Sequence, residues 1–266
     1  MGTLGFIGIG NMGYAMMKGA LTKYQKEELS FTSVDSARNE QVAAETGVAC
    51  VAGNVELVQS CKYVVLAIKP QVYDIVLAEI KDYITEDHVI ISIAPGITTD
   101  DVMEKLGGDV KVSRAMPNTP ALVNEGMAGL CFGKTLMSEE EKNTVVEFFE
   151  SFGKCEVIDE KLMNAVVCAS GSSPAYVYMF IEALADGAVK YGIPRDKAYS
   201  FAAQTVLGSA KMVLETNEHP GKLKDNVCSP GGTTIAAVAA LEEYGFRNAI
   251  IKATDRCYEK TVGFKK

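Results

Sequence analysis

Three glycines near the start of the chain have a spacing that could expose bare backbone to a ligand. Gly8, Gly10 and Gly13 form the sequence G-I-G-N-M-G directly after an apolar run. A helix is predicted to follow, from Asn11 to about Leu21. In such a loop the first glycine allows a tight turn, the second lets a pyrophosphate approach the backbone, and the third lets helix and strand touch. The pattern predicts a dinucleotide site, the alternative being a glycine-rich turn without a ligand.

The residues around the end of the second predicted strand bear on which dinucleotide is bound. Asp35 is expected to end that strand about twenty residues after Gly13, where a carboxylate accepts hydrogen bonds from the adenosine ribose and repels a 2′-phosphate. Arg38, with Ser33 and Ser36, is close enough in the sequence to bind a phosphate instead. The sequence therefore leaves NAD and NADP open.

Two further segments are expected at the carboxyl edge of the same sheet, where folds of this kind bind ligands. A-I-K-P at 67–70 places Lys69 there, either beside a cofactor or as a solvated cap. M-P-N-T-P at 116–120 is a polar loop stiffened by two prolines around Asn118 and Thr119, although a plain turn explains it equally well.

Two segments in the second half combine small residues with a predicted helix start. S-G-S-S-P-A-Y at 170–176 offers a serine N-cap and Pro174 in the first turn, and helix capping alone explains it. C-S-P-G-G-T-T at 228–234 contains two consecutive glycines, which is more than a cap requires. They would let a small anion reach free N–H groups at the positive end of a helix, and capping, with Thr233 contributing, is the competing explanation.

The available side chains restrict the chemistry. The two histidines, His88 and His219, have no partner at the spacing of metal ligands and are expected to be ordinary surface or loop residues. No metal site and no serine with a histidine base is predicted. A nicotinamide cofactor brings its own hydride, so the protein needs only to orient an acceptor and stabilise charge. A protonated C=N bond is an acceptor that a hydroxyl and backbone amides can serve.

The elements that position these residues follow from the apolar pattern. Short apolar runs alternate with amphipathic segments, which is typical of a parallel sheet with crossover helices. Strands are predicted at residues 4–8, 31–35, 63–68, 88–93, 110–114, 129–132 and 154–158. A helix between the last two is expected to begin at a capping box, Ser138 to Glu141.

After Asp159 the strand signals stop, and the rest indicates alanine-rich helices with a break at Gly192 and Pro194. We therefore expect an α/β Rossmann-type dinucleotide-binding domain at 1–159, followed by an all-α dimerisation and substrate-binding domain at 160–266. Such a short helical region has difficulty covering its own apolar faces, which favours dimerisation over packing on its own sheet domain.

Composition excludes several partners. The chain has 266 residues and a net charge of −8, so unspecific attraction to nucleic acid or anionic lipid is not expected.

The seven cysteines contain no C-x-x-C pair and lie in apolar runs, as reduced cytosolic thiols do. The uncharged stretch 162–181 is interrupted by Asn164 and by S-G-S-S-P, which argues against a membrane span. The beginning of the sequence lacks the features of a secretory signal, and a cytoplasmic location is expected.

Six segments, in order along nearly the whole chain, together resemble pyrroline-5-carboxylate reductase. They are GFIGIGNMG, AIKP, RAMPNTPALV, SGSSPAYV, LKDNVCSPGGTT and GFRNAIIKA. Each is unspecific alone, and the combination is specific. The resemblance implies reduction of 1-pyrroline-5-carboxylate to L-proline with NADPH or NADH, the last step of proline biosynthesis. It also implies a Rossmann domain joined to a helical dimerisation domain, in a homodimer or larger homo-oligomer.

The resemblance also implies roles for residues of this chain. Together with Asp35 and Arg38, the residues expected at the cofactor are Gly8, Ile9, Gly10, Asn11, Met12, Gly13, Asn54, Ala67, Ile68, Lys69 and Pro70. Those expected at the substrate are Ser229, Gly231, Gly232, Thr233 and Thr234. The loop amides would bind the substrate carboxylate, and Thr234 would act as the catalytic residue at the ring nitrogen. Two positions depart from the pattern, because Ser173 stands where many relatives have glycine and Asp35 suits NADH in a family that often favours NADPH.

Two other interpretations stay open. One is a β-hydroxyacid or related imine reductase on the same architecture, although residues 160–185 lack the asparagine and lysine pattern of the β-hydroxyacid dehydrogenases. The other is a dinucleotide-binding sensor or scaffold without turnover. The intact P-G-G-T-T segment argues against a sensor, which could lose a substrate loop freely.

Overall fold

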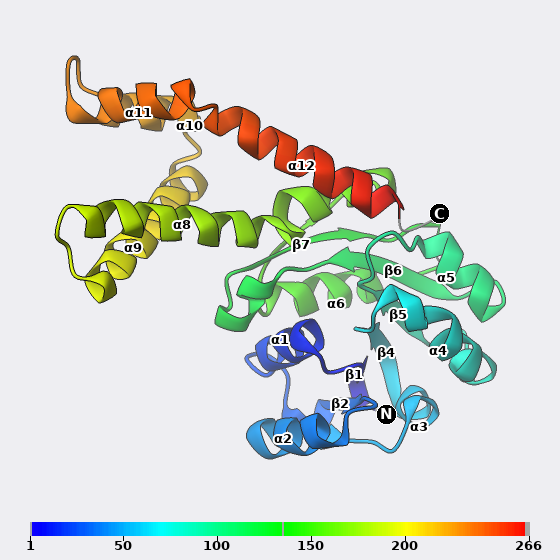
Figure 1. Cartoon of the computed structure of the whole chain (residues 1–266). Coiled ribbons are helices and arrows are strands. Elements are labelled where there is room, and N and C mark those ends of the chain that lie inside the picture. The colour runs from blue at the N-terminus through cyan, green and yellow to red at the C-terminus, as the bar shows by residue number, and fades with distance from the viewer. Residues whose placement is uncertain (1, 135, 264–266) are drawn as a thin grey trace. The chain divides into compact units, whose positions relative to one another are not determined.

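The computed structural model describes residues 2–134 and 136–263, which form two compact units (Figure 1). The first, here called the sheet unit, contains the chain up to Ser172 and again from Cys257 onward. The second, the helical unit, is Ser173–Arg256. Residues 160–172 therefore belong to the sheet unit, whereas the predicted boundary assigned them to the helical domain.

The sheet unit is built on one eight-stranded sheet with the order β3-β2-β1-β4-β5-β6-β7-β8. Its strands are β1 (Gly2–Ile7), β2 (Leu29–Thr32), β3 (Ala49–Cys50), β4 (Cys61–Leu66), β5 (Val89–Ser92), β6 (Lys111–Met116), β7 (Gly126–Cys131) and β8 (Gly153–Val157). The first six follow the strand order of dinucleotide-binding folds. All seven predicted strands are confirmed, and β3 was not predicted because it consists of two exposed residues.

One strand pair is not part of the parallel arrangement. Neighbouring strands run parallel throughout except for β6 and β7, which are antiparallel. The connection between them, residues 117–125, is shorter than the dozen or so residues that a parallel crossover requires. The M-P-N-T-P segment lies in this reversal.

Helices cover both faces of the sheet, as Figure 1 shows. One face packs against α1 (Asn11–Ala20), α2 (Ser36–Thr46) and α6 (Glu139–Glu150), and the other against α3 (Asn54–Ser60), α4 (Tyr73–Ile80) and α5 (Thr99–Leu106). The strands between them are buried on both sides, with Phe6 and Phe31 on the first face and Val64 on the second. This double covering fixes the carboxyl edge of the sheet, where the glycine loop lies.

The predicted capping box at the start of α6 is confirmed, and it carries a buried charge. The Ser138 hydroxyl accepts from the Glu141 N–H at 3.2 Å, and the Glu141 carboxylate accepts from the Ser138 N–H at 3.0 Å. The same carboxylate lies 2.9 Å from Lys111 Nζ and 3.0 Å from Lys62 Nζ. Burial alone would raise the pKa of Glu141, but the hydrogen bonds from Lys111, Ser138 and Lys62 lower it to about 2.

Replacing Glu141 with glutamine is expected to destabilise the fold by about 2 kcal/mol at neutral pH, since hydrogen bonds to a charged group are weakened. A lowered folded-state pKa gives stability that is present above the unfolded value of 4.5 and is lost as the pH falls toward about 2. Urea unfolding of parent and variant between pH 7 and 3 should therefore show a difference that shrinks below pH 4.5. A difference that stays constant over this range would contradict the expectation.

His88 and Asn118 have roles that the sequence did not indicate. His88 lies in the loop before β5, which agrees with the prediction of a surface or loop position, but it is buried: its ring contacts Thr85 and the Val58 carbonyl, both at 2.9 Å. Burial follows from its place directly before β5. Asn118 is also buried, and its side chain donates to the Ser170 carbonyl at 3.1 Å and accepts from the Met127 N–H at 2.9 Å. It joins the β6–β7 connection to the segment before α8.

The helical unit contains five helices, the last of which continues beyond it. They are α8 (Ser173–Lys190), α9 (Arg195–Thr216), α10 (Pro220–Val227), α11 (Thr233–Glu243) and α12 (Phe246–Val262). The break at Gly192 and Pro194 is confirmed, with Gly192 at a φ of 96°. The short helix α7 (Met163–Val166) precedes α8 and is followed by a π-helical turn, Val167–Gly171. No strand follows Asp159 in the described part of the chain.

The core of the helical unit is very small. Its buried apolar cluster consists of Ala185, Ala198 and Ala202. Large apolar side chains lie on its surface instead, including Tyr178, Met179 and Tyr244, the last of them 85% exposed. Within the described residues, no helix has the length and apolar character needed to cross a bilayer.

Candidate functional site

The glycine loop has the backbone that its sequence predicts. It joins the end of β1 to the start of α1, and Gly8 has a φ of 95°, a conformation that side chains with a Cβ rarely adopt. The Gly8 N–H donates to the Thr32 carbonyl at 2.8 Å. A Cβ on Gly8 would lie 2.5 Å from the Ala67 carbonyl oxygen, so only glycine fits this turn.

The other two glycines differ in the space around them. A Cβ on Gly13 would lie 2.2 Å from the Gly8 carbonyl oxygen, so glycine is required where α1 touches the loop. A Cβ on Gly10 would meet no atom within 4 Å. The space beside Gly10 is therefore open in front of the start of α1, where helix N–H groups favour a phosphate. This geometry fits a dinucleotide.

The predicted cofactor residues outside the glycine loop fall into two groups. Ala67 is brought together with the loop: its N–H donates to the Ile7 carbonyl at 2.9 Å, and its side chain would lie 3.1 Å from a Cβ on Gly13. Lys69 is exposed just before a 3-10 turn, Pro70–Val72. Asn54 begins α3 and donates to Glu79 of α4 at 2.7 Å. The roles of Lys69 and Asn54 toward a cofactor stay predictions.

The prediction that Asp35 ends the second strand is wrong. β2 ends at Thr32, and Asp35 is the N-cap of α2, where its carboxylate accepts from the Arg38 N–H at 3.0 Å. The reason is that a carboxylate at an N-cap satisfies a backbone donor that the helix leaves free. The residue that directly follows the strand is Ser33, whose hydroxyl donates to Asn39 at 2.6 Å.

The candidate substrate loop, residues 228–232, joins α10 to α11 in the helical unit. Gly231 has a φ of 69°, and a Cβ on Gly232 would lie 2.7 Å from the Ser229 hydroxyl oxygen. The Gly232 N–H donates to the Ser229 carbonyl at 3.0 Å, which closes the loop on itself. The positive φ of Gly231 thus favours glycine in this turn, and Gly232, with no side chain, leaves the first turn of α11 accessible.

The start of α11 corrects the predicted role of Thr233. The N-cap is Gly232, which has no side chain to cap with, and Thr233 is the exposed first residue of the helix. Since the first N–H groups of a helix have no partner within it, those of this turn are available to an anion. Thr234 follows, half-buried, and its hydroxyl has no hydrogen bond to another residue that the structure describes.

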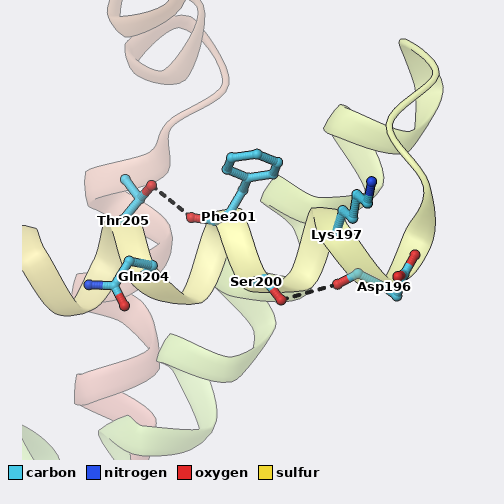
Figure 2. A pocket seen from close by; sticks show the side chains of 6 residues that line it. All are labelled: Asp196, Lys197, Ser200, Phe201, Gln204 and Thr205. Carbon is cyan, nitrogen blue, oxygen red and sulfur yellow. Dashed lines mark hydrogen bonds between the residues drawn. The ribbon is translucent and has the colours of Figure 1, made fainter.

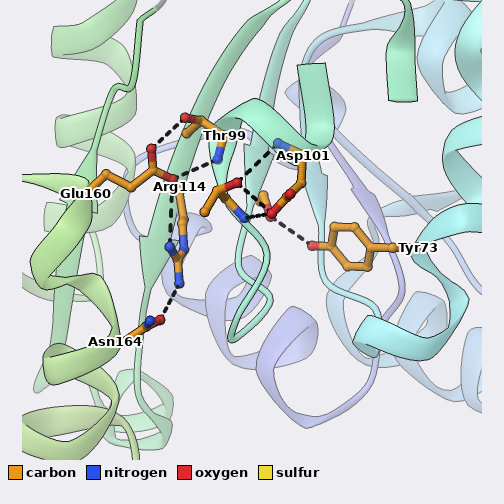
Figure 3. A network of polar contacts seen from close by, with 8 residues as sticks. Tyr73, Thr99, Asp101, Arg114, Glu160 and Asn164 are labelled. Atoms are coloured by element: carbon orange, nitrogen blue, oxygen red, sulfur yellow. Dashed lines mark hydrogen bonds and ion pairs between the residues drawn. The ribbon is translucent and has the colours of Figure 1, made fainter. Parts of the chain in front are cut away.

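A buried polar network lies at the carboxyl end of β5 and β6 (Figure 3). The side chain of Arg114 on β6 is 2% exposed, and its guanidinium lies 3.7 Å from Glu160 and donates to Asn164 at 3.1 Å. Glu160 in turn accepts from the Thr99 N–H and hydroxyl, both at 2.7 Å, at the start of α5. This network was not predicted from the sequence, although an arginine within an apolar strand was a signal.

A hollow of about 520 Å³ lies along α9 (Figure 2) and does not have the features of a substrate site. It is lined by Asp196, Lys197, Ser200, Phe201, Gln204 and Thr205. The Ser200 and Thr205 hydroxyls donate to carbonyls of their own helix, at 3.3 Å and 2.8 Å. Substrate sites have polar groups that converge on the ligand, and these hydroxyls are used within α9.

Comparison with known proteins places this geometry in a family. A family model for pyrroline-5-carboxylate reductase dimerisation matches residues 160–263, and one for coenzyme F420-dependent NADP oxidoreductase matches residues 3–96. The pyrroline-5-carboxylate reductase of Escherichia coli (strain K12) is 48% identical over 266 residues, covering 99% of this chain and 98% of that protein. The chain belongs to the pyrroline-5-carboxylate reductase family.

Other members of the pyrroline-5-carboxylate reductase family agree in sequence and in fold. The Pisum sativum enzyme is 41% identical, with coverage of 97% of this chain and 95% of that protein. The crystal structure of Plasmodium falciparum pyrroline carboxylate reductase with NADP bound has a TM-score of 0.90 at 34% identity, covering 99% of this chain and 98% of that one. The family and the fold class expected from the sequence are thereby confirmed.

Proposed function

We propose that this chain reduces 1-pyrroline-5-carboxylate to L-proline with NADPH or NADH, the last step of proline biosynthesis. The full-length similarity to pyrroline-5-carboxylate reductases carries the proposal. The glycine loop has open space at Gly10, and the start of α11 follows two glycines and has no side-chain cap. These features supply the two kinds of site that this reaction needs.

The proposed cofactor site is the glycine loop, Gly8 to Gly13, with Asn54, Ala67, Ile68, Lys69 and Pro70 at neighbouring strand and helix ends. The bound dinucleotide supplies the hydride, which adds to C5 of the pyrroline. The Gly10 backbone and the first N–H groups of α1 bind the pyrophosphate. Asp35 and Arg38 belong to the adenosine end of this site.

The proposed substrate site is the loop Ser229 to Gly232 with Thr233 and Thr234. The free N–H groups of the first turn of α11 bind the substrate carboxylate, since the positive end of a helix favours an anion. The Thr234 hydroxyl accepts a hydrogen bond from the ring N–H of the protonated imine. When hydride adds to C5, the electron pair of the C=N bond becomes the nitrogen lone pair and the positive charge disappears. The same hydroxyl then donates to the amine.

The direct test is the oxidation of NADPH and NADH, followed by absorbance, with pyrroline-5-carboxylate, a set of β-hydroxyacids or no substrate. Oxidation only in the presence of pyrroline-5-carboxylate, with formation of L-proline, is the expected result. Binding of either cofactor without turnover of pyrroline-5-carboxylate would contradict the proposed reaction.

The exposed apolar faces of the helical unit indicate a subunit interface. An apolar groove of about 750 Å³ runs along α8, α11 and α12, and its lining includes Met179, Phe180, Leu241 and Ile250. A core of three alanines cannot offset the exposure of such a surface. The proposed assembly is a homodimer or larger homo-oligomer, with residues 160–266 as the dimerisation region.

Light scattering at micromolar concentration is expected to give at least the mass of a dimer, because the exposed apolar area is reduced only when copies associate. Leu241 lines the groove, so Leu241→Glu places a charge on the proposed interface without changing a residue of the sheet unit. This variant should lower the mass or the activity. A fully active monomer of the parent chain would contradict the assembly.

The proposed location is the cytoplasm. All seven cysteines are free thiols, and burial raises the pKa of Cys131 to about 12 and those of Cys155 and Cys168 to about 11. Thiols kept in this protonated form are compatible with a reducing compartment. The domain division at residue 160 is likewise a proposal, supported by the start of the dimerisation match at that residue.

A further inference from the structure

The side chain of Arg38 is held by an aromatic ring next to the glycine loop. Tyr14 directly follows Gly13 in the first turn of α1, and its N–H donates to the Gly10 carbonyl at 2.9 Å. The guanidinium carbon of Arg38 lies 4.6 Å from the centroid of the Tyr14 ring. A guanidinium within about 6 Å of an aromatic face is attracted to it. Arg38 is thus anchored to the helical turn that carries the loop.

The Tyr14 ring is itself fixed from α2. Its hydroxyl donates to Glu45, and Lys18 Nζ lies 3.6 Å from the same carboxylate oxygen. Tyr14 and Lys18 therefore both engage the charge of Glu45 and connect α1 with α2. This leaves the Tyr14 ring in a defined position for Arg38.

Arg38 forms no ion pair with a carboxylate among the described residues, and its Nη1 group donates to the neutral Gln41 at 3.0 Å. The nearest acidic influence is Glu45, whose pKa is lowered mainly by the Tyr14 hydrogen bond and less by Lys18 and Arg38. A guanidinium has five N–H donors in a plane, which match a phosphate in a bidentate manner. One face of the guanidinium lies on the Tyr14 ring, and one N–H group donates to Gln41. The other N–H groups at its edge can bind a ligand.

The position that would favour NADH has no carboxylate. In dinucleotide-binding folds a carboxylate at the end of the second strand binds the ribose hydroxyls of NAD. Here the residue after Thr32 is Ser33, and the Asp35 carboxylate, two residues further on, accepts from the Arg38 N–H at the start of α2. The carboxylate that would repel a 2′-phosphate is therefore displaced from the end of β2, and the Arg38 guanidinium lies nearby.

We propose that Arg38, positioned by Tyr14, binds the 2′-phosphate of NADPH and gives this chain a preference for NADPH over NADH. Tyr14 is the positioning residue and Arg38 the one that contacts the ligand. The inference rests on the proposed function in one respect only, namely that the glycine loop binds a nicotinamide dinucleotide.

The test is direct titration of the full chain with NADPH and with NADH, without pyrroline-5-carboxylate. The parent chain is expected to bind NADPH at least about tenfold more tightly, the lower end for hydrogen bonds to a charged group. Arg38→Ala should weaken NADPH more than NADH and bring the two dissociation constants to within about threefold of each other. Equal affinities of the parent, or equal losses in Arg38→Ala, would overturn the inference.

Variants of Tyr14 separate positioning from general stability. Tyr14→Leu removes the ring and should reduce the NADPH-to-NADH affinity ratio by about threefold, as expected for a partly exposed cation–π contact. Tyr14→Phe keeps the ring and loses only the hydroxyl bonded to Glu45, so it should retain more of the ratio than Tyr14→Leu. A matched control is Tyr199→Leu, since Arg195 lies 5.6 Å above the Tyr199 ring in the helical unit, and this variant should leave the ratio unchanged.

The outcomes distinguish this inference from the proposed function. An unchanged ratio in Tyr14→Leu would overturn the positioning role. If the parent binds both cofactors equally and reduces pyrroline-5-carboxylate, the proposed function stands and the preference is wrong. If neither cofactor binds, both are wrong.

Discussion

Replacement of Thr234 with alanine is expected to lower kcat/KM for pyrroline-5-carboxylate by about ten- to 150-fold. The hydroxyl is half-buried at the second position of α11 and has no other partner among the described residues, so it is available to the ring nitrogen. A hydrogen bond to a charged group contributes about 1.5 to 3 kcal/mol, and each 1.4 kcal/mol is about tenfold in rate. Steady-state kinetics at saturating cofactor would measure the effect.

Thr233 and a serine variant provide the controls for this experiment. Thr233→Ala keeps the backbone N–H and removes an exposed hydroxyl that does not cap the helix, so stability should change by no more than about 0.5 kcal/mol. Thr234→Ser retains a hydroxyl and should recover most of the activity. The assignment of Thr234 is wrong if folded Thr234→Ala stays within about twofold of the parent, or if Thr233→Ala is the poorer catalyst.

Replacement of Glu160 with leucine is expected to destabilise the chain by about 3 to 5 kcal/mol. Arg114 is 2% exposed, and loss of the carboxylate leaves its charge buried without a countercharge. Its Nε–H already has no hydrogen-bond partner among the described residues. Leucine also removes the acceptor for the Thr99 N–H at the start of α5. Urea unfolding would measure the loss.

Removal of Arg114 instead of Glu160 is expected to destabilise the chain less. Arg114→Met removes the buried charge, while Glu160, 23% exposed, keeps both of its bonds to Thr99. The double variant, Arg114→Met with Glu160→Leu, should therefore be more stable than Glu160→Leu alone, as buried ion pairs replaced by apolar residues often are. An Arg114→Met variant less stable than Glu160→Leu would refute this account of the network in Figure 3.

Local patterns in the sequence were sufficient for most of the fold. The spacing from Gly8 to Gly13 predicted the loop and α1, since the positive φ of Gly8 and the contact of Gly13 with the Gly8 carbonyl are local constraints of one βα unit. The box from Ser138 to Glu141 predicted the start of α6 because both partners are three residues apart. The end of β2 was misplaced because Asp35 is compatible with a strand end and with an N-cap, and only the competing hydrogen bond to Arg38 decides between them.

Contacts between distant segments could not be predicted in this way. Arg114 and Glu160 are in different elements, and no periodicity relates them. Tyr14 likewise had no predicted role, because only the folded arrangement of α1 and α2 brings Arg38 over its ring. The candidate substrate residues were found through the family resemblance, because two glycines before a helix are also compatible with a simple turn.

The three-alanine core of the helical unit has a consequence for how the chain reaches its native state. The sheet unit has two extensive apolar clusters and can form them within one chain, whereas the helical unit gains little from intramolecular burial. Its consolidation is then a bimolecular event whose rate depends on the concentration of chains with a completed sheet unit. Dilution during refolding would therefore delay the appearance of activity without delaying the formation of the sheet, and synthesis of several chains on one messenger would shorten that delay.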